Sequence, residues 1–134
     1  MRRNNATLNG QLARVISETG HTDKVAVTDA GLPIPPGVER VDLALREGVP
    51  SFLAVLDSVL EELQIEGALL SEEMRTASPD MLREVEQRLL ACGVTPQFLP
   101  HSDFKAATAQ ARAAVRSGEF TPYANVLLTA GVVY

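Results

Sequence analysis

Six polar side chains stand in loops between apolar segments, where catalytic and binding groups commonly gather on a rigid scaffold. They are His21, Asp23, Asp29, His101, Tyr123 and Asn125. Histidine exchanges protons near neutral pH, a carboxylate accepts hydrogen bonds, and amide and phenol groups both donate and accept them. This combination favours proton transfer on a small polyhydroxylated substrate.

Three of these residues, His21, Asp23 and Asp29, lie within the stretch 20–36, around which the rest of the chain is organised. His21 follows a glycine, and Asp29 ends a short β-branched run before a loop stiffened by three prolines. A carboxylate between a strand and a rigid loop is well placed at the lip of a cleft. Structural roles stay open as well, because an aspartate before Ala-Gly is also typical of turns and a lone histidine is often structural.

Other kinds of site find little support in the motifs. The histidines show neither HxH nor HExxH spacing, so we expect no metal site. The chain has no G-x-S-x-G elbow, and it contains neither G-x-G-x-x-G nor G-x-x-x-x-G-K-[ST], the glycine-rich motifs of nucleotide-binding loops. The sequence therefore does not predict a serine nucleophile or a nucleotide-binding loop.

Composition narrows the class of protein further. The 134 residues are 46% apolar and 22% charged, which predicts one globular domain. A net charge of −5 argues against nucleic acid as a partner, and the absence of any apolar run of about 18 residues argues against a membrane span. The single cysteine, Cys92, cannot form an intrachain disulfide, which favours a reducing compartment such as the cytoplasm.

Periodicity and turn residues predict alternating helices and strands. Helices are expected over 8–19 with Asn9 as N-cap, over 51–63, from Ser78-Pro79 to Gly93, and over the alanine-rich segment 103–117 with Ser102 as N-cap. Strands are expected over 24–28, 38–43, 65–70 and 97–99. The apolar C-terminal run 126–134 should be buried in this subunit or a neighbouring one. We predict a three-layer α/β/α domain around a mixed, largely parallel sheet.

Four segments resemble the D-ribose pyranase family, in the family's order and over nearly the whole chain. They are H-T-D-K-V-A-V-T-D-A-G-L-P-I-P at 21–35, G-V-P-S-F at 48–52, S-G-E-F-T-P-Y-A-N at 117–125 and A-G-V-V-Y at 130–134. The related fucose mutarotases are similar around G-H-x-D, but differ where this chain has Gly31-Leu32 and usually lack P-I-P. The resemblance therefore implies a single ribose-pyranase-like domain that acts on ribose.

The resemblance also implies an activity and its residues. The family interconverts the pyranose and furanose forms of a sugar without cofactor or metal. His21 matches the acid/base residue, and Asp29, His101 and the triplet Tyr123-Ala124-Asn125 match sugar-binding positions. Members form homodecamers of two pentameric rings, with sites near subunit boundaries. Whether Asp29 orients His21 or binds sugar stays open, as do a mutarotase for another sugar such as fucose and a non-catalytic sugar-binding accessory protein.

Overall fold

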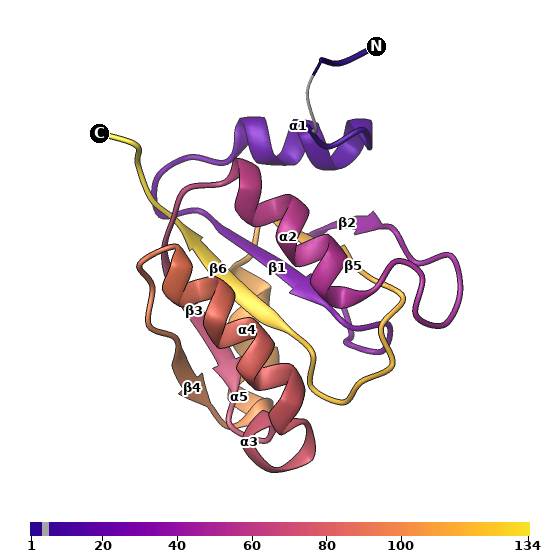
Figure 1. Ribbon diagram of the computed structural model, residues 1–134, viewed down its shortest axis with the longest axis vertical. Helices are drawn as coiled ribbons and strands as arrows, with labels where there is room; N and C mark the ends of the chain where they lie inside the picture. The colour runs from indigo at the N-terminus through magenta and orange to yellow at the C-terminus, as the bar shows by residue number, and fades with distance from the viewer. Residues whose placement is uncertain (4–5) are drawn as a thin grey trace.

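Six strands form one mixed sheet at the centre of the molecule (Figure 1). The computed structural model describes residues 1–3 and 6–134. The strand order across the sheet is β2-β5-β1-β6-β3-β4. The strands are β1 (Lys24–Thr28), β2 (Glu39–Asp42), β3 (Ile65–Ser71), β4 (Gln97–Leu99), β5 (Ala113–Arg116) and β6 (Val126–Ala130).

Strand direction gives the sheet two unlike ends. β2, β5 and β1 pair in parallel, as do β3 and β4, whereas β6 runs antiparallel to both of its neighbours, β1 and β3. The carboxyl ends of the five parallel strands therefore meet the start of β6 at one end of the sheet. The predicted mixed, largely parallel sheet is confirmed.

Three helices cover one face of the sheet: α1 (Gly10–Glu18), α2 (Phe52–Glu62) and α4 (Pro79–Ala91). Their apolar sides pack with inward-facing strand residues into the main core, in which Phe52, Leu56 and Val27 are fully buried. Local capping agrees with the sequence. The side chain of Asn9 accepts a hydrogen bond from Leu12 N at 2.9 Å, and Ser51 caps α2 in the same way.

The opposite face carries a thinner layer, so the predicted three-layer arrangement is confirmed. The short helix α5 (His101–Ala107) lies behind the sheet in Figure 1 and buries Phe104 against Ala26, Ala114 and Leu127. The loop after β1 packs beside it through Leu32. Short helices α3 (Met74–Ala77) and η1 (Thr108–Gln110) complete the connections. None of the helices described is long and apolar enough to cross a membrane.

One predicted helix is wrong. Residues 103–117 are not a single helix capped by Ser102: α5 begins at His101, a short 3-10 turn follows, and β5 occupies Ala113–Arg116. Ala113 and Val115 are completely buried in β5, between β2 and β1. Alanine favours helices in isolation, but pairing on both sides and full burial override that preference here.

The C-terminal run divides into a buried and an exposed part. β6 is a central strand whose Val126 and Leu128 are completely buried, as expected for so apolar a segment. Val133 and Tyr134 extend beyond the sheet, with exposed fractions of 86% and 99%. Within a single chain, these last two side chains therefore remain uncovered.

Candidate active site

Polar residues converge at the carboxyl end of the parallel strands. Asp29 directly follows β1, His101 follows β4, and Tyr123 comes shortly before β6. Together they face a hollow of about 360 Å³, which is within the size range of small-molecule sites. Its lining residues are Asp29, Gly31, Leu32, Pro33, His101, Lys105, Pro122 and Tyr123.

The carboxylate of Asp29 is held rigidly. Asp29 N donates to Asn125 Oδ1 at 2.8 Å, and Asn125 Nδ2 donates back to Asp29 Oδ2 at 3.1 Å. The other carboxylate oxygen, Oδ1, accepts the backbone N–H groups of Gly31 and Leu32 at 3.0 and 2.8 Å. Asp29 therefore does form a turn, as its sequence context allowed, and the same bonds fix its orientation beside the hollow.

His101 is anchored through both its backbone and its ring. Its backbone N–H donates to the carboxylate of Glu73, at 2.9 and 3.1 Å from the two oxygens, and its Nδ1 lies 2.8 Å from Ser71 Oγ. The ring of Tyr123 meets the imidazole edge to face, with 4.9 Å between centroids. Glu73, just after β3, thus helps to position His101.

Hydrogen bonds to the Glu119 side chain hold the loop that carries Tyr123 and Asn125. Tyr123 adopts a left-handed backbone with φ of 62°, and Ala124 is fully buried, so its side chain belongs to the core. Glu119 accepts hydrogen bonds from Phe52 N at 3.0 Å and from the Thr121 hydroxyl at 2.9 Å. Burial alone raises the pKa of the Glu119 carboxyl, but these bonds outweigh burial and hold the pKa below its ordinary value.

His21 lies in a turn at the opposite end of β1. Thr22 follows it with a φ of 70° and donates its N–H to Ala130 O. Asp23 closes the turn by accepting from Gly20 N at 2.9 Å and from Arg112 at 2.8 Å. These two bonds, the backbone bond first, lower the pKa of the Asp23 carboxyl. Asp23 therefore shapes the turn that presents His21.

The partner of His21 is Glu66, at the start of β3. His21 Nε2 lies 2.9 Å from Glu66 Oε2, and the histidine side chain is 51% exposed. β1 separates His21 from Asp29, and five strand residues span roughly 16 Å. Within one chain Glu66, and not Asp29, therefore orients the imidazole.

Three residues near these groups were missed by the sequence interpretation. Lys105 lines the hollow one helical turn after His101, and that i, i+4 spacing was a usable signal. Ser71 and Glu66 stand at the two ends of β3, far along the chain from the histidines they contact. Only the pairing of the strands brings them there, so no local pattern predicts their roles.

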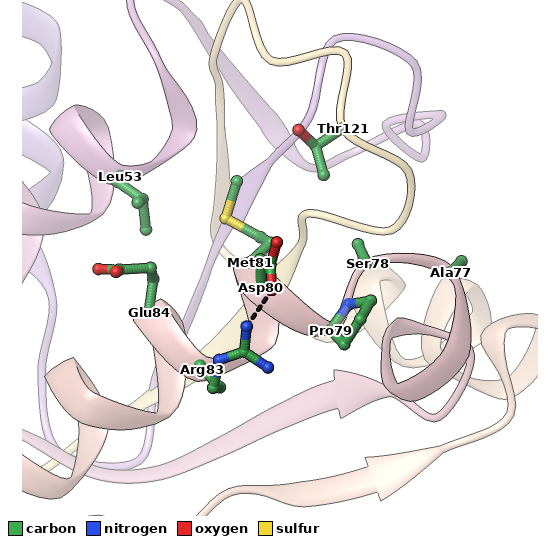
Figure 2. Close-up of a pocket in the computed structure, with 9 residues that line it drawn as sticks. All are labelled: Leu53, Ala77, Ser78, Pro79, Asp80, Met81, Arg83, Glu84 and Thr121. Atoms are coloured by element: carbon green, nitrogen blue, oxygen red, sulfur yellow. Dashed lines mark hydrogen bonds and ion pairs between the residues drawn. The ribbon is translucent and has the colours of Figure 1, made fainter.

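A larger hollow of about 670 Å³ lies elsewhere, between α2, α4 and the loop at Thr121. Figure 2 shows Leu53 and Met81 at its wall and the Arg83–Asp80 ion pair. It includes none of the residues predicted for the site, and its charged arginine is already paired. Over residues 1–3 and 6–134, no three His, Cys, Asp or Glu side chains cluster closely enough to hold a metal ion.

Fold and site together define an α/β protein that presents fixed hydrogen-bonding groups to a small polar ligand at the carboxyl end of its sheet. Residues 2–133 match the model of the RbsD / FucU transport protein family. The chain belongs to this family.

Several curated relatives are similar over almost their whole length. The D-ribose pyranase of Geobacillus kaustophilus is 46% identical over 95% of this chain and 92% of its own. The D-ribose pyranase of Aliivibrio fischeri (strain MJ11) is 44% identical over 97% of this chain and 98% of its own. The resemblance to ribose pyranases noted in the sequence is confirmed.

Solved structures agree with the fold. Bacillus subtilis RbsD complexed with D-ribose superposes with a TM-score of 0.94 at 36% identity, and the match covers 100% of both chains. The fucose mutarotase of Streptococcus pneumoniae, in complex with L-fucose, reaches 0.80 at 24% identity, covering 93% of this chain and 94% of that one. The second likeness is one of fold.

Proposed function

We propose that this chain is a D-ribose pyranase, an isomerase that interconverts the pyranose and furanose forms of D-ribose. The observation that carries the proposal is the hollow in which Asp29, His101 and Tyr123 converge while Asn125 fixes the carboxylate. Such fixed, mostly neutral groups suit a sugar whose hydroxyls both donate and accept. The full-length similarity to D-ribose pyranases supports ribose as the substrate.

The reaction needs two proton movements. Ring opening removes the proton of the anomeric hydroxyl and delivers one to the ring oxygen, which breaks the bond between that oxygen and the anomeric carbon. Closure by a different hydroxyl reverses both movements and gives the other ring size. His21 supplies the acid/base group, and such a group contributes typically about 10²–10⁴-fold. Asp29, His101, Tyr123 and the Ala124-Asn125 backbone hold the sugar, and no cofactor takes part.

The site is completed by a second copy of the chain. His21 lies at the opposite end of β1 from Asp29, so the His21 of one subunit acts in the hollow of its neighbour. Contact between unlike ends is heterologous, and repeated contacts of this kind form a ring when the rotation between neighbouring subunits closes. The exposed Val133 and Tyr134 lie at the His21 end and supply apolar area for that contact.

The assembly is a homo-oligomer, and the family resemblance favours a decamer of two pentameric rings. We also infer a cytoplasmic location, because one unpaired cysteine, Cys92, fits a reducing compartment. Neither nucleic acid nor a membrane is among the partners we propose, given the net charge of −5.

Saturation-transfer NMR on ribose tests the function directly. Irradiation of one ring form should transfer saturation to the other faster with the protein than without it, and His21→Ala should abolish most of that gain while the protein still assembles. Faster exchange for fucose than for ribose would identify a different substrate. Saturable binding without faster exchange of any sugar would identify a non-catalytic accessory protein.

A further inference from the structure

Ser71 is the last residue of β3, and its side chain is completely buried beneath His101. Its hydroxyl oxygen lies 2.8 Å from His101 Nδ1. Among the described residues this is the only hydrogen bond of the hydroxyl. Ser71 is therefore placed to act on the imidazole and on nothing else.

The direction of this bond follows from burial. A serine hydroxyl carries one proton, and a buried O–H group without an acceptor is costly. If Nδ1 carried the ring proton and donated it to Ser71, the serine proton would have no partner. If Ser71 donates to Nδ1 instead, both groups are satisfied and the ring proton must reside on Nε2.

We propose that Ser71 is a positioning residue that fixes neutral His101 as the tautomer protonated on Nε2. The bond to Glu73 anchors the backbone of His101, and the Ser71 hydroxyl and the ring of Tyr123 hold the imidazole, so the proton on Nε2 has a set direction. His101 then acts as a hydrogen-bond donor, and never as an acceptor, toward a ligand in the hollow.

This deepens the proposed function and, for its ligand, rests on it. Asp29 is an acceptor whose carboxylate is fixed by Asn125 and by backbone N–H groups. A donor at His101 and an acceptor at Asp29 match two neighbouring hydroxyl groups of one ligand. One hydroxyl can accept from His101 while the other donates to Asp29. The pair therefore selects a polyol in one orientation.

The tautomer is measurable without any sugar. The chain has two histidines, so in His21→Ala the ¹⁵N spectrum of ring-labelled, assembled protein reports on His101 alone. At a pH where the ring is neutral, we expect Nε2 to be protonated and Nδ1 to be unprotonated and hydrogen-bonded. In the Ser71→Ala background the Nδ1 shift should move toward that of an imidazole in water, and Ser71→Thr should restore it.

Ser117→Ala is the matched control. Ser117 is equally buried and directly follows strand β5, but it donates to Thr28 O at 2.6 Å and does not bond His101. Its removal should leave the His101 nitrogen shifts unchanged. A proton on Nδ1 in the wild-type background, or nitrogen shifts indifferent to Ser71→Ala, would overturn the proposal.

With His21 intact, Ser71→Ala should weaken ribose binding by about three- to tenfold, the usual worth of one oriented hydrogen bond, and change kcat less than KM. Unchanged ribose affinity would contradict the inferred role of the Nε2 proton in binding. If the nitrogen spectrum is as expected but no ribose exchange occurs, the proposed function fails and the tautomer assignment stands. The two ideas are thus separable.

Discussion

Two inactive variants of this chain should restore activity when they are combined. His21→Ala lacks the proposed acid/base group at one end of β1, and Asp29→Asn lacks the carboxylate at the other end. Each should lose most ribose exchange as a homo-oligomer, His21→Ala by about 10²–10⁴-fold. If a site takes His21 from one subunit and Asp29 from the next, a mixed ring contains some sites in which both residues are intact.

The recovery can be worked out from the geometry. In a randomly mixed ring with equal amounts of the two variants, half of the subunits offer an intact His21 and half offer an intact Asp29. A site is intact only when both conditions meet across one contact, so about one quarter of wild-type activity should return. Co-expression with two different affinity tags, followed by tandem purification and saturation-transfer NMR on ribose, measures the recovery.

A mixture of two variants altered in the same hollow provides the control. Asp29 and His101 line one hollow within a single chain, so every site in an Asp29→Asn and His101→Ala mixture carries one defect. That mixture should stay inactive, whereas His21→Ala with His101→Ala should recover. Absence of recovery for His21→Ala with Asp29→Asn in properly mixed oligomers would refute the shared site. Recovery in the control mixture would show that the assignment of residues to the two half-sites is wrong.

Three further perturbations test single contacts. Glu66→Ala should slow ribose exchange by about three- to tenfold, because the bond to His21 Nε2 is lost, and should change the free energy of unfolding little, because the pair is half exposed. Glu66→Gln should retain most activity, and full activity in Glu66→Ala would show that Glu66 is not part of the site. Since the pKa of Glu119 is lowered on folding, its ionised form stabilises the protein above the ordinary value of 4.5, and that contribution is lost as the pH falls below it. Glu119→Gln should therefore lower the free energy of unfolding by about 1 kcal/mol at neutral pH and by less at about pH 3.5. Urea titrations at both pH values measure this difference, and an equal loss of stability at both would contradict the prediction. Deleting residues 132–134 should reduce the oligomeric state and the activity together; sedimentation velocity and the exchange assay measure both, and a fully active monomer would contradict the role given to the C-terminus.

Local signals predicted the parts of the fold that depend on neighbours in sequence. Asn9 caps α1 as its type suggests, and Lys24–Thr28 forms a strand as its β-branched run suggests. The alanine-rich segment failed for a physical reason. Its side chains are small enough for a helix or a strand. Pairing with β1 and β2, which flank β5 and lie far from it in the chain, stabilises the strand.

In the candidate site, too, local signals predicted the residues themselves but not their long-range partners. Loop position and residue type singled out His21, Asp29, His101 and Asn125. They could not reveal that Asp29 pairs with Asn125, 96 positions away, or that His21 pairs with Glu66, 45 positions away. Such partners depend on the strand order of the sheet. A sequence fixes that order through the sum of many long-range contacts, and no single spacing encodes it.

The strand order also explains why His21, the proposed acid/base residue, stands so far from the proposed sugar-binding residues. β1 runs between them, and its pairing with both β5 and β6 makes it a rigid spacer that no loop movement can shorten. Under the proposed assignment, a monomer holds two half-sites at opposite ends of β1, and association joins them. Activity should then depend on the fraction of chains assembled, so Tyr134, which we propose lies at the interface, should affect catalysis without touching the substrate. In the proposed arrangement the subunit contact is itself a part of the active site.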